Sequence, residues 1–245
     1  MLSKNQIKLI KSLSQKKNRQ QLGLFTVEGI KGINEFLNSD FELETLFTTK
    51  LIFDAPSQQI IEISDSDLKK ITTLKNPNTA LAIFKIPRPV SPTNEGLIIV
   101  LDDVRDPGNL GTIIRLCDWY GVKELVCSLN TVDCYNSKVV QATMGSLTRV
   151  NVTYLNLDIY LASYKMDVFG TFMTGKNVYT SNLPSEGIII LGNEANGISE
   201  TIASKVNRQI TIPQFGNNKS TESLNVANAT AIILSEFRRR TIIEK

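Results

Sequence analysis

The stretch GLIIVLDDVRDPGNLGTIIRLCDWYG (96–121) determines the fold class. It opens with the continuous apolar run GLIIVLD (96–102), which is typical of a parallel strand covered by helices on both faces. In the second half, apolar residues recur at i, i+3, i+4 and i+7 from Leu110 until Gly121, which predicts an amphipathic helix. A buried strand that leads into such a helix is the repeating element of an α/β fold.

The rest of the C-terminal half repeats this alternation. Because strands alternate with helices, we expect a parallel sheet with both faces covered. The patterns predict strands at 124–128, 149–155, 167–173, 187–194 and 209–213, and helices at 136–146, 157–165 and 223–240.

The N-terminal third predicts a second, smaller α/β domain. Three prolines within IPRPVSPTNEG suppress helix and strand and predict a linker at 87–96. The chain therefore divides into domains at 1–90 and 96–245, which suits its 245 residues. Before the linker, we expect helices at 4–14, 30–38 and 65–73 and strands at 24–29, 44–49, 58–64 and 79–86.

Composition narrows the class of protein. Hydrophobic residues make up 42% and charged residues 21%, which is ordinary globular usage. No apolar run approaches the ~18 residues that span a bilayer, and the basic N-terminus lacks the apolar core of a signal peptide. These patterns predict a soluble cytoplasmic protein without a membrane partner.

The chain contains no histidine, which excludes a Ser-His-Asp or Cys-His mechanism and removes the commonest neutral metal ligand. The three cysteines form no CxxC pair, so we expect buried thiols rather than a disulfide framework. We expect no metal site. The chemistry must then use carboxylates, Arg, Lys, Ser, Asn or backbone amides.

Basic residues concentrate at the N-terminus. Residues 1–20 contain six Lys and Arg and no acidic residue. Such a cluster suits a polyanion such as nucleic acid, and its alternative is a solvated basic helix face. Lys16, Lys17 and Arg19 are the candidate RNA-binding residues.

Three polar, glycine-containing segments follow predicted strands, where ligands bind in open α/β sheets: 102–121, 191–199 and 212–240. None has the spacing of a phosphate-binding P-loop or of a GxGxxG dinucleotide fingerprint. Taken singly, their residues have ordinary interpretations. Asn109 or Ser223 would cap a helix, Arg115 would be an exposed helical arginine, Glu194 would be a loop acid, and Arg238–Arg240 would either complement a helix dipole or contact nucleic acid.

Taken together, DPGNLGTIIRLCDWYG, LGNEANGIS and IPQFGNNKSTESLNVANATAI resemble the motifs of the SpoU/TrmH family of RNA ribose 2′-O-methyltransferases, in the SPOUT class. The resemblance covers about 96–240. KKNRQQLGLFTVEGIKGINEFL (16–37) also resembles the start of the family's ribosomal-protein-like substrate-binding domain. The segment between Ile212 and Leu224 is about three residues longer than the family's usual form, and Ala227 replaces a common Ser.

The resemblance implies a fold with a deep trefoil knot, an exception to the rule that chains do not thread loops. It also implies S-adenosylmethionine as cofactor and a homodimer that builds the site across two subunits. The matching catalytic positions are Asn109, Arg115, Glu194, Ser223 and Asn225, and the cofactor-binding positions are Leu191, Gly192, Asn193, Ile212 and Leu224.

The expected function is therefore 2′-O-methylation of a ribose in RNA, with Arg115 as the leading catalytic candidate. Because arginine stays protonated, electrostatic stabilisation and positioning are its safer role. A full N-terminal domain favours ribosomal RNA over tRNA. The alternatives are a tRNA ribose methyltransferase and a catalytically inactive RNA-binding or ribosome-assembly factor.

Overall fold

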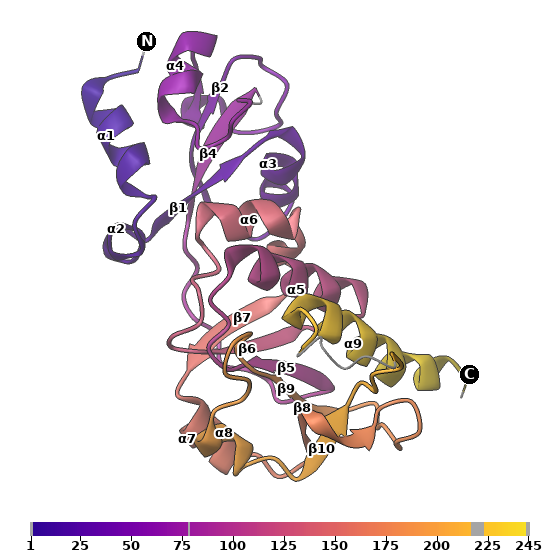
Figure 1. Cartoon of the computed structure of the whole chain (residues 1–245). Helices are drawn as coiled ribbons and strands as arrows, with labels where there is room; N and C mark the ends of the chain where they lie inside the picture. Colours follow the sequence, from indigo (N-terminus) through magenta and orange to yellow (C-terminus); the bar gives the residue numbers. More distant parts are fainter. Residues whose placement is uncertain (1, 78, 217–222, 244–245) are drawn as a thin grey trace. The chain divides into compact units, whose positions relative to one another are not determined.

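The structure is a computed structural model that describes residues 2–77, 79–216 and 223–243 (Figure 1). The chain forms two compact units. The N-terminal unit consists of Met1–Pro89 and Asp133–Thr148, and the C-terminal unit consists of Val90–Val132 and Arg149–Lys245.

The chain passes between the units more than once. The first crossing, between Pro89 and Val90, falls within the predicted linker. Asp133–Thr148, from the middle of the predicted 96–245 domain, belongs to the N-terminal unit. There the Tyr135 ring lies 4.8 Å from the Phe25 ring, between centroids. The C-terminal unit is therefore discontinuous in sequence.

The N-terminal unit is built on a four-stranded sheet in the order β1-β4-β2-β3. β4 pairs antiparallel with β1 and β2, and β3 pairs parallel with β2. The elements are α1 (Lys4–Ser12), α2 (Lys16–Leu22), β1 (Leu24–Glu28), α3 (Ile30–Leu37), β2 (Leu43–Thr48), η1 (Ser57–Gln59), β3 (Ile60–Glu62), α4 (Asp65–Ile71), β4 (Ala80–Lys85), α6 (Ser137–Thr143) and η2 (Ser146–Thr148).

Helix α1 shows how the basic N-terminal segment is attached. Ser3 and Gln6 form a capping box at its start. Its apolar side joins a buried cluster through Ile10, together with Leu68 and Ile71 of α4. The basic side stays in water, where Lys4, Lys8 and Lys11 are exposed.

The C-terminal unit contains a six-stranded sheet in the order β10-β8-β9-β5-β6-β7, and every pairing in it is parallel. This confirms the predicted α/β class with a parallel sheet. The elements are β5 (Leu97–Leu101), α5 (Pro107–Trp119), β6 (Glu124–Ser128), β7 (Asn151–Leu155), α7 (Leu157–Ala162), β8 (Val168–Asn177), β9 (Gly187–Leu191), α8 (Glu200–Ala203), β10 (Arg208–Thr211) and α9 (Val226–Ile243).

The two central strands of this sheet bring distant segments together. β5 and β9 are buried along their whole length and pair in parallel, with Leu101 opposite Leu191. The Asp102 N–H continues the pairing by donating to the Leu191 carbonyl at 2.9 Å. Because parallel strands end at the same edge, the loops that follow β5 and β9 lie side by side. Helix α9 packs on α5, which leads out of the first of these loops (Figure 1).

Several elements differ from the sequence prediction. The helix expected at 4–14 is α1, which ends at Ser12, and α2 and α8 were not predicted. The last helix begins at Val226 rather than at residue 223. The three cysteines are buried, as expected, and burial raises the pKa of the Cys117 thiol. None of the described helices is long and apolar enough to cross a membrane.

Candidate active site

Helix α5 presents its polar face from a well-defined N-terminus. The N-cap is Asp106, whose carboxylate accepts the Asn109 N–H at 2.8 Å, and Pro107 takes the first helical position. The N-cap interpretation of Asn109 is therefore wrong. Since Asp106 already satisfies the helix end, the Asn109 side chain is available for contacts outside the helix.

The loop after β9 is a closed turn organised by Asn193. Its backbone exchanges two hydrogen bonds with Gly197, and its Oδ1 accepts the N–H groups of Ala195 and Asn196. Its Nδ2 donates to the Asp103 carbonyl at 2.7 Å and so ties this loop to the loop after β5. A Cβ on Gly192 would lie 2.1 Å from the Gly197 carbonyl carbon, which leaves no room for a side chain there.

Three of the predicted catalytic residues meet through hydrogen bonds. Asn109 Nδ2 donates to Glu194 Oε1 at 2.8 Å, and Asn225 Nδ2 donates to Asn109 Oδ1 at 2.9 Å. The three side chains come from helix α5, the loop after β9 and the residue before α9. We call this set the Asn225–Asn109–Glu194 relay.

The relay has a fixed direction. Asn225 Oδ1 accepts the N–H groups of Ala227 and Asn228, so only its Nδ2 is left to donate. Asn109 must then accept through Oδ1 and donate through Nδ2 to the Glu194 carboxylate. Asn225, rather than the expected Ser223, thus caps the last helix.

Arg115 lies six residues after Asn109 on the same helix, about 9 Å further along the axis. It is exposed, as are Thr112 and Trp119 on the same face. Within the described parts of the chain, no carboxylate forms an ion pair with Arg115 and no contact joins it to the relay. Its guanidinium is therefore free to bind an anion from solution.

The predicted cofactor-binding residues differ in their exposure to solvent. Leu191 is buried and Ile212 is half-buried, whereas Leu224 is 50% exposed. The polar groups of Asn193 are engaged inside the loop, so this residue shapes the turn. Residues 217–222, which include most of the predicted loop expansion, lie outside the described residues. Ser223 is exposed, and no contact joins it to the relay among the described side chains.

Sequence reasoning missed Asp103 at this edge of the sheet and the structural contact of Arg238 at the far end of α5. Asp103 has a left-handed backbone (φ 61°), is held by Ser128 Oγ through its N–H, and pairs with Arg105. This ion pair raises the pKa of Arg105. Arg238 donates to the carbonyls of Tyr120 and Gly121 at 2.7 and 3.0 Å and so fastens α9 to the end of α5. The paired acids directly after β5 were the available signal for Asp103.

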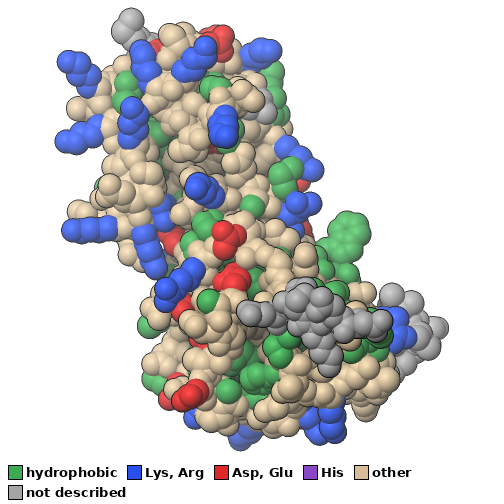
Figure 2. Space-filling view, in the orientation of Figure 1, with side chains coloured by type: hydrophobic (Ala, Val, Ile, Leu, Met, Phe, Trp, Pro, Cys, Tyr) green, Lys and Arg blue, Asp and Glu red, His purple; other side chains and the backbone are tan. Residues whose placement is uncertain are grey.

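The candidate RNA-binding residues need one correction. Lys16 and Lys17 are exposed, and Figure 2 shows Lys and Arg side chains along the edge of the N-terminal unit where α1 and α2 lie. Arg19 is only 2% exposed. It bonds to Asp133 at 2.5 Å and to the Leu13 and Ser14 carbonyls, so the prediction that it binds RNA is wrong.

Comparisons with known proteins identify the family of the chain. Residues 96–235, which include the relay, match the SpoU rRNA methylase family. The chain belongs to this family. Residues 4–82 match the MRM3-like substrate binding domain.

Relatives of this SpoU-family chain match different shares of its length. The 23S rRNA (guanosine(2553)-2′-O)-methyltransferase RlmP of Bacillus subtilis (strain 168) is 30% identical over 245 residues, which cover 96% of this chain and 97% of RlmP. The 23S rRNA (guanosine-2′-O-)-methyltransferase RlmB of Neisseria meningitidis is 30% identical over 60% of each chain.

Two solved structures of methyltransferases also match this chain over nearly its whole length. A TrmH-family protein from Porphyromonas gingivalis is 40% identical with a TM-score of 0.90, covering 98% of this chain and 99% of its own. An AdoMet-bound rRNA methyltransferase from Sinorhizobium meliloti is 29% identical with a TM-score of 0.86. The match covers 98% of this chain and 96% of that protein's chain.

Proposed function

We propose that this SpoU-family chain transfers the methyl group of S-adenosylmethionine to the 2′-hydroxyl of a ribose in 23S ribosomal RNA. The observation that carries the proposal is the Asn225–Asn109–Glu194 relay, which joins all three family motifs at one edge of the parallel sheet. The names of RlmP and RlmB support 23S rRNA as the substrate class.

The side chains of the site suit the demands of this reaction. A ribose hydroxyl is a poor nucleophile and must lose its proton as its oxygen is methylated. Because arginine is a cation in proteins, we assign Arg115 to binding a phosphate beside the target ribose and to stabilising the developing negative charge on the 2′-oxygen. The relay fixes Glu194 through Oε1 and leaves Oε2 to orient the hydroxyl.

The cofactor would be held by the loop after β9 and by the segments at Ile212 and Leu224. This donor set fits an adenosyl group, because it combines the backbone of a glycine turn with the half-exposed Leu224. The bound cofactor supplies a sulfonium methyl group, whose transfer needs no metal. Leu191, Gly192 and Asn193 contribute the shape of the turn rather than free side chains.

We further propose that the C-terminal unit contains the trefoil knot of the SPOUT class and works as a homodimer in the cytoplasm. Trp119 of α5 is 84% exposed, and Trp is among the residues that are enriched in protein–protein interfaces. Light scattering of the purified protein should give twice the mass of one chain. A monomer that is fully active would contradict the dimer.

The N-terminal unit is proposed to bind the RNA. It contains 14 Lys and Arg against 10 Asp and Glu, a net charge of +4, whereas the C-terminal unit contains 13 against 14, a net charge of −1. A positive unit attracts the phosphate backbone without reading its sequence. Lys16 and Lys17 are the residues assigned to this contact.

The test is methyl transfer to defined RNA. Purified protein and S-adenosylmethionine are incubated with an unmodified 23S rRNA transcript or with unmodified tRNA, and the digested nucleosides are identified by mass spectrometry. We expect one 2′-O-methylated nucleoside from 23S rRNA alone. Modification of tRNA alone would refute the substrate class, and cofactor binding without transfer to any RNA would refute the activity.

A further inference from the structure

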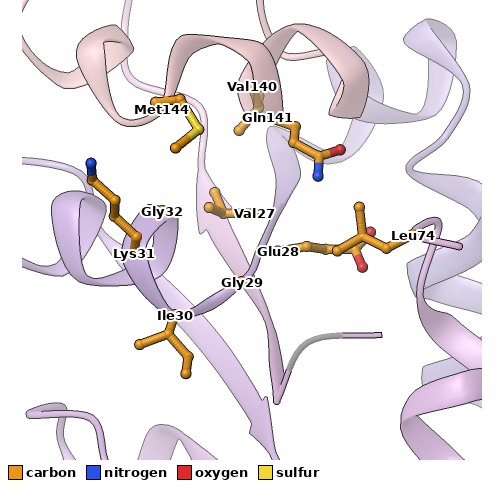
Figure 3. A pocket seen from close by; sticks show the side chains of 10 residues that line it. All are labelled: Val27, Glu28, Gly29, Ile30, Lys31, Gly32, Leu74, Val140, Gln141 and Met144. Carbon is orange, nitrogen blue, oxygen red and sulfur yellow. The ribbon is translucent and has the colours of Figure 1, made fainter. Parts of the chain in front are cut away.

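A cavity of about 170 Å³ lies wholly within the N-terminal unit (Figure 3). Its walls come from the end of β1 and the first turn of α3, from Leu74 after α4, and from helix α6. Helix α6 belongs to the segment that crosses over from the SpoU-family part of the sequence. The cavity is therefore lined by residues from the N-terminal third of the sequence and by residues from its SpoU-family part.

The walls are suited to a flat apolar ring. Val27, Ile30, Leu74 and Met144 line the cavity. An apolar cavity of about 150 Å³ admits benzene, so this volume accommodates one ring system. Met144 is 44% exposed beside the opening, and thioethers make favourable contacts with aromatic rings.

The polar residues of the cavity lining include one cation that can contact a phosphate. The Glu28 carboxylate is engaged by the Thr72 hydroxyl and by the Thr73 N–H and hydroxyl. Lys31 is exposed, and no carboxylate of the described residues forms an ion pair with it. The exposed amide of Gln141 adds a hydrogen-bond donor and an acceptor.

We propose that this cavity binds a single unpaired nucleotide of the RNA substrate. The base enters between the apolar side chains, Gln141 bonds to its edge, and Lys31 contacts the adjoining phosphate. A base inside a duplex is stacked on both sides and cannot enter, so the site selects a looped-out or single-stranded nucleotide. The inference rests on the proposed function, because it takes RNA as the substrate.

The test compares two cavity variants with matched controls in the same unit. Gln141→Trp fills the cavity and Lys31→Glu reverses the charge at its edge. Gln58→Trp and Lys50→Glu make the same changes at exposed positions that do not line the cavity. Binding of full-length protein to the 23S rRNA transcript is measured by filter retention at fixed salt, and thermal unfolding checks each variant.

We expect each cavity variant to weaken RNA binding about tenfold, the scale of one stacked base, and each control to bind like the wild type. The affinity for S-adenosylmethionine should stay unchanged in all four. Cavity variants that bind the transcript as tightly as their controls would overturn the proposal, as would a wild type that does not bind it. If Gln141→Trp unfolds, the difference in RNA affinity between Lys31→Glu and Lys50→Glu decides whether the proposal stands.

The same preparations separate this inference from the proposed function. A wild type that methylates 23S rRNA while the cavity variants keep normal affinity refutes the cavity site alone. A wild type that binds RNA through the cavity but transfers no methyl group refutes the proposed activity alone.

Discussion

Arg19 in the N-terminal unit and Arg115 in the C-terminal unit are the two arginines that the sequence marked for function, and they have opposite environments. Arg19 is 2% exposed and bonded to Asp133 and two carbonyls. Arg115 is exposed and pairs with none of the described carboxylates. The first stabilises the fold of its unit, and the second is available to a substrate.

Basic residues that cluster in the sequence can differ in exposure and therefore in role. Lys16, Lys17 and Arg19 stand together in sequence, yet only the lysines face solvent. What separates them is a partner far along the chain, since Asp133 lies 114 residues from Arg19. The proposed division of labour follows: the N-terminal unit supplies solvated positive charge and the C-terminal unit supplies the ordered polar site.

The largest expected effect is on the fold of the N-terminal unit. Arg19→Ala leaves the Asp133 carboxylate without its cation in a mostly buried place, and breaking such a pair costs about 3–5 kcal/mol. Chemical denaturation should show this loss in the free energy of unfolding. Lys17→Ala, on the same helix, should change it by less than about 0.5 kcal/mol. Equal effects of the two substitutions would contradict the assigned role of Arg19.

The second-largest effect is expected at Arg115, the exposed counterpart of the buried Arg19. Arg115→Ala should lower kcat by about 10²–10³, because one preorganised cation opposite the developing charge is lost. Its affinity for S-adenosylmethionine, measured by calorimetry, should remain near the wild-type value. If methylation and cofactor affinity fell together by the same factor, the assigned role would be wrong.

A smaller effect is expected from the middle of the relay. Asn109→Ala removes the donor to Glu194 and the acceptor for Asn225, and should lower kcat about tenfold to a hundredfold, as expected for a hydrogen bond to a charged group. Thr112→Ala is the control on the same helix face, since its hydroxyl donates to the Gly108 carbonyl of its own helix. Single-turnover rates measure both variants, and equal rates would refute a role for the relay.

The smallest effect concerns the basic surface. Reversing Lys16 and Lys17 to Glu should weaken RNA binding and make the dependence of log K on log salt shallower, by about 0.7–0.9 for each phosphate that the protein no longer neutralises. Filter binding across a salt series measures the slope. An unchanged slope would mean that these lysines belong to an ordinary solvated helix face and do not contact RNA.

Local patterns were sufficient to predict most elements. The apolar run before Asp102 predicted the buried strand β5, and the spacing from Leu110 predicted the buried face of α5. Helix α2, with the sequence KKNRQQL, was missed because it has almost no apolar residues to set a period. Its one buried residue, Arg19, bonds to Asp133, which lies 114 residues further along the chain.

Long-range contacts limited the prediction of the site. The family motifs identified Asn109, Glu194 and Asn225, but not that they bond to one another, because that depends on the pairing of β5 with β9. The transfer of α6 to the N-terminal unit could not be predicted either. It rests on contacts such as Tyr135 with Phe25, which leave no periodic signal.

The most direct test of the central claim is calorimetric titration of the purified protein with S-adenosylmethionine and S-adenosylhomocysteine. The claim is that the edge of the parallel sheet beside the relay is a cofactor site. We predict binding of both ligands with one site per chain, unchanged in Arg115→Ala. Absence of binding at high micromolar ligand, with and without 23S rRNA present, would contradict it and favour a factor that only binds RNA.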